Sequence, residues 1–368
     1  MKICHLTTCH KFDDHRIFYK HSIPQVSFGY DVSISSFDNV LKPTSFYREN
    51  IFISILKSSR TFSIFSRVIR AFRLFLFSLK SNADIFILHE PELLLFVPFM
   101  KIFKKTKVVY DIHEDYPVLV KSRLQNFKIR FLLEKFTSLY LKFTLWFVDS
   151  RIVVSQTIYD KFCSNGDMIF PNFSSPLVQT DIEKFRQLNP IKIIYAGVIS
   201  SKKGAILLID LAKKLNKKEF NFELHVCGSP IHCNKFSQTK FNDFINSENV
   251  FFHGELPQRE LHKLLAKTHI GLCFIEDNPH HNLSMPAKIL DYISQRNFVI
   301  FSENLNLEEV CKSGLGQKCP NSCSELIRRI ELLVSKQLYF LQDRSNKKFL
   351  LDSILPKYKL YLQHLSST

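Results

Sequence analysis

The sequence lacks the signals that would place the chain within a membrane or direct it out of the cell. Nowhere in its 368 residues is there a run of the ~18 apolar residues that a spanning helix needs. The N-terminus reaches His5 and His10 before a signal-peptide core could form. The nine cysteines include no CxxC pair, which favours reduced thiols over disulfides or a metal cluster. These absences predict a cytoplasmic protein.

Acidic residues are also few compared with basic ones. Lys and Arg number 50 and Asp and Glu 34, which gives a net charge of +16 and predicts contact with an acidic partner. Nucleic acid, an anionic membrane surface and a phosphate-bearing substrate all fit this charge. The basic residues are spread along the chain and form no nucleic-acid-binding motif, which argues against nucleic acid.

Short β-branched runs alternate with helical stretches, the pattern of parallel sheets covered by helices. The length favours two domains, and a proline-containing stretch over 170–190 reads as the linker between them. Ligands of such sheets bind beyond the carboxyl ends of the strands. The predicted strands are 3–6, 31–35, 85–88, 108–111, 151–155, 168–170, 192–196, 222–227, 250–253, 270–275 and 298–302, and the main helices are 16–28, 205–216, 236–245, 258–266 and 287–294.

Polar loops follow the strands of the first half. The loop 7–16 contains His10, Asp14 and Arg16, and Asp14 is also suited to capping the next helix. The loop 111–117 contains His113 and Glu114, although a histidine that only stabilises the loop is an equal alternative. For the similar segment 89–92, a helix start with acidic first-turn residues is the simpler explanation.

A loop at 195–204 joins a strand to a helix in the second half. Gly197 and Gly204 flank Ser200, Lys202 and Lys203, beside a helix N-terminus that favours anions. The loop matches neither the Walker pattern nor GxGxxG. It therefore predicts a phosphate-binding loop of a more general kind.

A second helix start, at 284–292, carries Lys288 and Asp291 three residues apart on one helix face. Either the two side chains pair with each other, or both face a ligand.

The order of these segments resembles the retaining glycosyltransferases of family 4. The opening segments 2–18 and 29–32, a "DxHE"-like loop at 109–117, a "G…KG"-like loop at 195–204 and a PxKxxEY-like stretch at 286–292 carry the resemblance, from residue 2 to about 302. It implies an α/β GT-B fold, with two Rossmann-like doubly wound domains facing a cleft. Residues 1–175 would form the acceptor-side domain and 176–345 the nucleotide-sugar-binding domain. The remaining residues, 346–368, would form a helix that packs back toward the first domain.

The resemblance also implies roles for individual residues. Lys203 and Lys288 would stabilise the departing diphosphate, Asp291 would accept hydrogen bonds from the ribose, and His113 would lie beside the transferred sugar. The implied donor is a nucleotide-diphosphate sugar, with no metal or cofactor. The implied acceptor is a glycan or a lipid-linked molecule in surface polysaccharide synthesis. The remaining implied contacts are Gly197, Ser200, Lys202 and Gly204 on the donor side and His10, Asp14, Arg16 and Glu114 on the acceptor side.

The sequence departs from the family pattern at three positions. Val198 replaces an arginine, Leu283 stands where the first member of an acidic pair is expected, and Asp291 replaces a glutamate. Two alternatives therefore stay open. One is a catalytically degenerate homologue that binds or assembles, and the other is a sugar-nucleotide 2-epimerase.

The segment 57–80 has six basic residues and no acidic one. On a helix, Arg67, Arg70, Arg73 and Lys80 share one arc, and an apolar arc lies broadly opposite. The functional interpretation is docking on anionic lipid, which would place the protein at the inner face of the cell membrane. The alternative is an ordinary surface helix, packed on the sheet with a solvated basic face.

Overall fold

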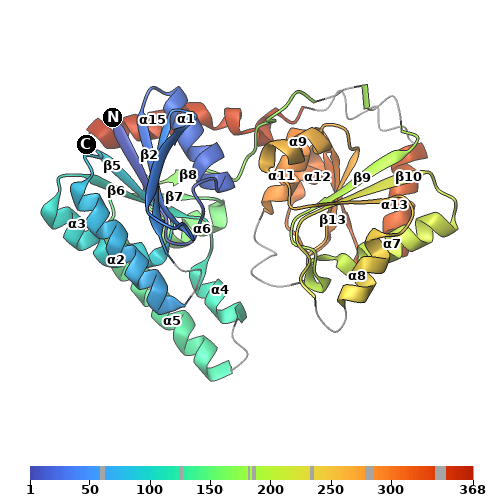
Figure 1. The fold of residues 1–368 in the computed structure, drawn as a ribbon, viewed down its shortest axis with the longest axis horizontal. Helices are drawn as coiled ribbons and strands as arrows, with labels where there is room; N and C mark the ends of the chain where they lie inside the picture. The colour runs from blue at the N-terminus through green and yellow to red at the C-terminus, as the bar shows by residue number, and fades with distance from the viewer. Residues whose placement is uncertain are drawn as a thin grey trace. The chain divides into compact units, whose positions relative to one another are not determined.

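A computed structural model describes residues 1–58, 63–123, 127–180, 183–184, 188–232, 236–277, 285–335 and 345–367. They form two compact units: Met1–Asn172 together with Ile354–Thr368, and Phe173–Ser353. Each unit is a parallel sheet covered by helices, which confirms the predicted fold class (Figure 1). Among the described residues, no helix combines the length and apolar character needed to cross a membrane.

The first unit contains an eight-stranded sheet with the order β3-β4-β2-β1-β5-β6-β7-β8. Only the β3–β4 pair is antiparallel. Leu6 pairs with both Ser35 and Leu88, and Leu88 pairs with Tyr110, so β1, β2, β5 and β6 end at one edge. The loops that follow these strands therefore meet. The strands are β1 Lys2–Leu6, β2 Asp31–Asp38, β3 Thr44–Arg48, β4 Ile51–Lys57, β5 Ile85–Leu88, β6 Lys107–Ile112, β7 Ser150–Val153 and β8 Met168–Ile169.

The first helical segment differs in form from the single helix predicted over 16–28. It begins as a π-helix, η1 (His15–Ser22), and continues as the short helix α1 (Ile23–Ser27). Pro24, which has no N–H to donate to the preceding turn, stands where the two forms meet. The other helices of this unit are α2 Ile64–Lys80, η2 Pro91–Phe96, α3 Val97–Phe103, α4 Tyr116–Arg123, α5 Phe127–Thr144, η3 Leu145–Phe147, α6 Gln156–Phe162 and α15 Leu355–Ser367.

Helix α2 lies with Arg67 and Arg70 turned inward, which contradicts the alternative of a solvated basic face and equally removes these two arginines from a lipid-facing arc. Arg70 is buried, and its guanidinium donates to the Thr8 carbonyl over 3.0 Å. Arg67 forms two hydrogen bonds of 2.7 and 2.8 Å with Glu92. Because guanidinium groups find these acceptors inside the unit, the opposite apolar arc is the exposed one. Arg60 of the predicted segment lies outside the described residues.

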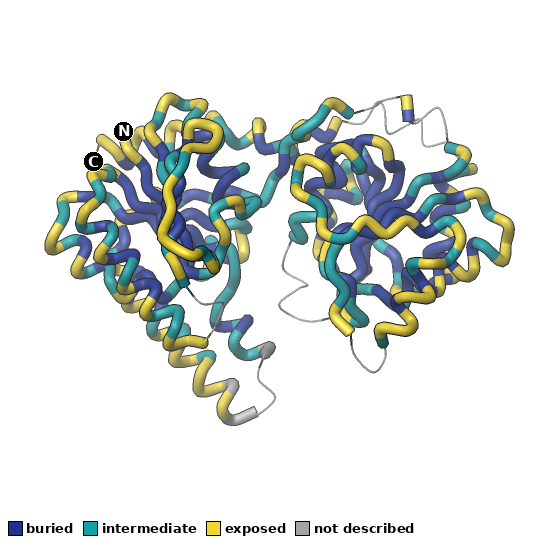
Figure 2. The backbone as a smooth tube through the Cα atoms, viewed as in Figure 1, coloured by how far each residue is buried: buried dark blue, intermediate teal, exposed yellow. Residues whose placement is uncertain are grey.

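The second unit contains a six-stranded parallel sheet with the order β11-β10-β9-β12-β13-β14. Buried side chains cover both faces of it, and its strands are the dark core of the unit in Figure 2. The strands are β9 Ile191–Ala196, β10 Phe222–Cys227, β11 Val250–Gly254, β12 Ile270–Cys273, β13 Phe298–Ser302 and β14 Gly316–Cys319. The helices are η5 Ser201–Lys203, α7 Ala205–Lys217, α8 Gln238–Ile245, α9 Gln258–Leu265, α11 Ala287–Ser294, α12 Glu308–Lys312, α13 Cys323–Ser335, η6 Lys347–Phe349 and η7 Leu351–Ser353.

The terminal helix α15 belongs to the first unit. Its Tyr358 is fully buried there, and its hydroxyl lies 2.6 Å from both His21 Nδ1 and the Gln25 amide nitrogen. The chain thus enters the second unit after Asn172 and returns to the first at Ile354.

Candidate functional site

The loop that follows β9 is shaped by two glycines. Gly197 has a φ of +120°, and a Cβ there would lie 3.3 Å from Lys288 Nζ. Gly204 has a φ of +85°, and a Cβ there would lie 2.7 Å from the Cβ of Phe274. A side chain at Gly204 would clash, and one at Gly197 would crowd the ammonium of Lys288. The loop therefore brings bare backbone close to a cation.

Lys288 stands in the first turn of α11, and its ammonium is buried. Within the part of the chain that the structure describes, its Nζ has no hydrogen-bond partner. It lies 4.1 Å from the centre of the Tyr195 ring, a cation–π contact. Burial lowers the pKa of Lys288 below its ordinary value. A buried ammonium without a hydrogen-bond acceptor leaves a place for an anion.

Lys203 is the second cation of this site. Burial lowers the pKa of Lys203, and the positive charge of Lys288 lowers it further. Lys202 differs, because its side chain is 80% exposed and lies 3.9 Å from Glu276. Ser200 accepts hydrogen bonds from the N–H groups of Lys203 and Ala205 through its backbone carbonyl. The structure therefore groups Lys203 with Lys288 and leaves Lys202 in solvent.

Asp291 lies one turn further along α11 and is buried. Its Oδ1 lies 3.7 Å from Nε2 of the fully buried His262, which sequence reasoning missed. The alternative ion pair between Lys288 and Asp291 is not formed, since Lys288 Nζ has no such partner among the described residues. Leu283, the position of the missing acid, lies outside the described residues.

Tyr292 fixes α11 against the sheet. Its hydroxyl accepts a hydrogen bond of 2.7 Å from the N–H of Ala196, at the end of β9. A Cβ on Gly271 of β12 would come within 2.3 Å of the Tyr292 ring, so only glycine fits beneath it. Tyr292 thereby sets the position of Lys288 relative to the loop after β9. The motif at 286–292 contains this tyrosine, but the pattern alone gave it no role.

In the first unit, the loops after β1, β5 and β6 bring His10, His113 and two carboxylates together. His10 Nδ1 lies 3.1 Å from Asp14 Oδ2, and its Nε2 lies 3.8 Å from Glu90 Oε1. The centres of the His10 and His113 rings are 5.4 Å apart. Burial disfavours the charged form of His10, but Asp14, Glu90 and Glu114 outweigh it and raise the pKa of His10 to about 9. His10 therefore carries positive charge at neutral pH.

Asp14 caps a helix, as considered for it, and also pairs with His10. Its Oδ1 accepts hydrogen bonds from the backbone N–H of Arg16 (2.9 Å) and of Ile17 (3.2 Å), which caps η1. Burial opposes its charge, but His10 and these N–H groups hold the pKa of Asp14 well below its usual range. One carboxylate thus both starts the helix and orients His10.

Arg16 is engaged inside the unit and does not line the polar loops. Its Nε and Nη2 donate to the two carboxylate oxygens of buried Asp111 over 2.8 and 2.6 Å. Its Nη1 donates to the Phe170 carbonyl and to Asn172. Arg16 and Asp111 thus form a buried bidentate pair, a geometry that suits a planar guanidinium, and the acceptor-side role of Arg16 stays a prediction.

Asp111 is also the centre of a buried histidine cluster that sequence reasoning missed. His89 Nδ1 lies 3.1 Å and His21 Nε2 3.5 Å from Asp111 Oδ2, and His5 Nδ1 lies 2.9 Å from His89 Nε2. Burial lowers the pKa of His5 to about 3 and that of His21 and His89 to about 4, so these rings are neutral. The sequence signal for this cluster was the pair of polar residues at the ends of β5 and β6, His89 and Asp111.

Glu90 ties the loop after β1 to the end of β5. Its carboxylate accepts hydrogen bonds from the Thr7 hydroxyl over 2.5 Å and from the Thr8 N–H over 2.8 Å. The helix start expected for this segment is present as η2, with Glu92 in its first turn. Glu90 holds its charge close to His10.

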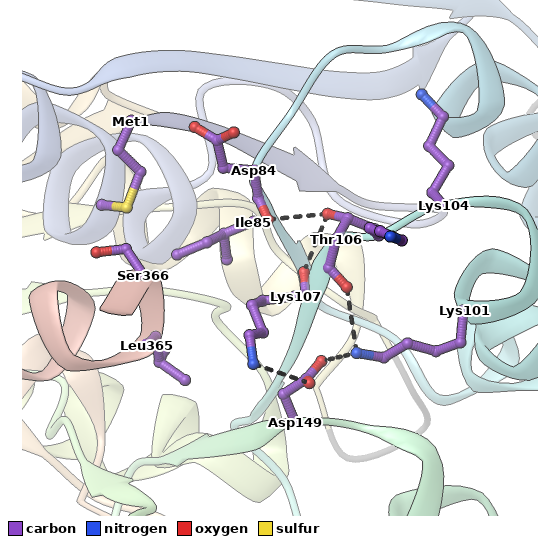
Figure 3. A pocket seen from close by; sticks show the side chains of 11 residues that line it. Met1, Asp84, Ile85, Lys101, Lys104, Thr106, Lys107, Asp149, Leu365 and Ser366 are labelled. Carbon is purple, nitrogen blue, oxygen red and sulfur yellow. Dashed lines mark hydrogen bonds and ion pairs between the residues drawn. The ribbon is translucent and has the colours of Figure 1, made fainter. Parts of the chain in front are cut away.

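A cavity of about 540 Å³ lies at the other end of the first sheet (Figure 3). Asp84 and Thr106 precede β5 and β6, and Asp149 precedes β7, so the cavity opens at the amino ends of these strands. Lys101 donates to Asp149 and to the Thr106 carbonyl. The cavity is therefore separate from the loops that carry His10 and His113.

Comparisons with known proteins agree with this geometry. Residues 179–346 match the family described as glycosyl transferases group 1. These residues therefore carry the domain that defines this family. The structure resembles sucrose-phosphate synthase from Thermosynechococcus elongatus, with a TM-score of 0.73 and 13% identity, covering 100% of both chains. The chain has the GT-B fold, and its residues 179–346 match the glycosyl transferases group 1 family.

Two further structures support this assignment of the fold to a GT-B glycosyltransferase. A glycosyltransferase from Rickettsia africae has a TM-score of 0.66 and 14% identity, over 100% of this chain and 99% of that one. Anabaena HepE in complex with UDP and glucose has a TM-score of 0.67 and 13% identity, over 99% of each chain. No curated protein sequence matches the chain.

Proposed function

We propose that this protein is a glycosyltransferase that moves a sugar, with retention of configuration, from a nucleotide-diphosphate sugar to a glycan or lipid-linked acceptor in surface polysaccharide synthesis. The buried ammonium of Lys288, which has no hydrogen-bond acceptor within the described residues and lies near Lys203, carries the donor half of the proposal. The UDP in the Anabaena HepE structure is a ligand of the kind that these cations would bind.

The chemistry of a nucleotide-sugar donor explains why two lysines would be needed at this site. When the bond between sugar and diphosphate breaks, negative charge grows on the departing phosphate, and preorganised cations stabilise that charge. Lys203 precedes α7 and Lys288 lies in the first turn of α11, so two helix N-termini add to the positive field. The bare backbone at Gly197 lets a phosphate approach closely. We therefore assign the diphosphate to Lys203 and Lys288.

Asp291 is the proposed ribose ligand. A carboxylate accepts hydrogen bonds from neighbouring hydroxyls, and Asp291 stands one turn beyond Lys288 on the same helix. His262, 3.7 Å from its Oδ1, would orient the carboxylate. In this proposal Asp291 and His262 bind the nucleoside, and the two lysines bind the diphosphate.

The first unit would supply the acceptor side. In the proposed mechanism the departing phosphate itself takes the proton of the acceptor hydroxyl, so no protein nucleophile is needed. His113 would orient the transferred sugar, and the protonated His10 would add positive charge beside it. Glu114 and Asp14 would hold these histidines in place.

Calorimetric titration with nucleoside diphosphates tests the donor half. UDP and GDP are the first probes, and Lys202→Gln is the control for Lys288→Gln because each removes one lysine charge. The proposal expects one diphosphate to bind the wild type and the control alike, and the Lys288 variant ~10- to 100-fold more weakly. Failure of the wild type to bind any nucleoside diphosphate would favour the degenerate homologue.

The products distinguish the remaining possibilities. With a bound nucleotide sugar and an oligosaccharide acceptor, NMR of the new glycosidic bond should show the anomeric configuration of the donor. An inverted product would contradict retention. Conversion of the nucleotide sugar alone into its 2-epimer would identify the isomerase instead.

A further inference from the structure

An apolar surface covers one side of the first unit. On α2, Phe65 is 76% exposed and Phe72 is 46% exposed, because the arginines of this helix face inward. At the end of α3, Ile102 and Phe103 are 73% and 65% exposed. Large apolar side chains scattered singly are normal on a protein, but a contiguous group of them marks an interaction site.

Helix α5 and the turn η3 extend this surface. Phe136 is 66% and Trp146 81% exposed. The inner faces of α2, α3 and α5 pack on the same hydrophobic core cluster, so all three helices cover one face of the sheet. The hydroxyl of Tyr140 on α5 donates to the Pro91 carbonyl at the start of η2, which also contacts α2. We call the outward side of α2, α3, α5 and η3 the apolar face; α2 and α5 run along it in Figure 1.

Positive charge predominates around the apolar face. The segments 64–80 and 97–108 contain no acidic residue. The single acid of 127–147, Glu134, is paired with Lys121 over 2.8 Å. Lys80, Lys105 and Lys142 lie on or directly after the same helices and, within the described residues, form no ion pair.

We propose that the apolar face binds the surface of an anionic lipid bilayer. Phe and Trp side chains enter the boundary between headgroups and acyl chains, and the lysines of the same helices would meet lipid phosphates. A second copy of this chain fits less well, because a twofold contact would bring these cations against their own copies. The proposal concerns the first unit and does not depend on the donor site of the second.

Vesicle co-sedimentation of the full chain without nucleotide tests this proposal. We expect retention on phosphatidylcholine–phosphatidylglycerol vesicles at low salt and its loss at high salt. Lys80→Gln with Lys142→Gln should weaken binding ~30-fold, since each cation near the surface is worth about 1 kcal/mol. The matched control is Lys213→Gln with Lys217→Gln, two exposed lysines on α7 of the second unit.

The apolar contribution needs its own variants. Phe136→Ser with Trp146→Ser should abolish retention, whereas Leu332→Ser, 41% exposed on α13, should leave it unchanged. Equal binding to neutral and anionic vesicles would overturn the proposal. So would a wild-type dimer in light scattering that Trp146→Ser converts to a monomer, without vesicle binding by either. UDP binding measured without vesicles keeps this outcome separate from failure of the donor site.

Discussion

Replacing Lys288 with methionine should stabilise the ligand-free protein and weaken its donor site at the same time. The substitution keeps the length and much of the volume of the side chain and removes only the buried charge. Replacing a lysine that stabilises the fold through hydrogen bonds or ion pairs would lower the stability instead. The two effects separate because Lys288 has no hydrogen-bond acceptor among the described residues.

The expected magnitudes follow from the contacts of the ammonium. Its cation–π contact with Tyr195 stabilises the charge by ~1–2 kcal/mol. Leaving its N–H donors buried without an acceptor costs ~1–3 kcal/mol, and more for a charged group. The lowered pKa shows that the unfavourable contributions win. We therefore expect Lys288→Met to raise the free energy of unfolding by ~1 kcal/mol and the melting temperature by ~2–4 °C.

The same change should weaken nucleoside diphosphate binding ~10- to 100-fold and slow sugar transfer by ~10²–10³. Thermal unfolding with and without UDP measures both effects, because a ligand that binds the folded state raises the melting temperature by mass action. Lys202→Met is the control, since its exposed side chain predicts no change in either measurement. A Lys288→Met protein that melts lower and still gains full stability from the nucleotide would refute this reasoning.

Three further outcomes follow from the structure. Lys203→Ala should weaken nucleoside diphosphate binding ~10-fold or more in calorimetry, whereas Lys202→Ala should change it by less than ~3-fold. His113→Ala should lower kcat by ~10²-fold with nucleotide affinity kept, and a matching loss of melting temperature would indicate a structural histidine instead. Stability should fall as the pH drops from about 6.5 to about 4, because His21 and His89 stay neutral when folded but gain protons when unfolded. Flat urea denaturation midpoints across this range would contradict the assignment.

The order of strands and helices was predictable because buried parallel strands read as apolar runs. Strands β10 and β13 have the predicted bounds, and β9 differs by one residue. The hairpin of β3 and β4 was missed. Thr44–Arg48 is an edge strand with mostly exposed residues, so it carries little hydrophobic pattern. The turn at Glu49 and Asn50, both at positive φ, was the remaining signal.

The sequence showed which residues of α2 share an arc, but not which arc faces the protein. Hydrophobic periodicity cannot show which arc is buried when the basic side chains have hydrogen-bond acceptors inside the unit. Arg70 has one at Thr8, and Arg67 has one at Glu92. Those acceptors come from segments far apart in the sequence. The cluster around Asp111 escaped prediction for the same reason, since no spacing indicates which distant histidine will meet a buried carboxylate.

Satisfaction of buried charge distinguishes the structural Arg16–Asp111 pair from the lysine of the proposed donor site. The Arg16–Asp111 pair is as buried as Lys288, but each guanidinium nitrogen of Arg16 has an acceptor. Removing one partner of such a pair leaves the other buried and unpaired, which destabilises the fold. Among the described residues, Lys288 has an aromatic ring but no hydrogen-bond acceptor beside its charge, so its burial is a cost that these contacts do not explain. The charge of Lys288 lies in the first turn of α11, next to the bare backbone of Gly197. Binding of an anion at this place would explain why the chain keeps a buried charge that destabilises the ligand-free fold.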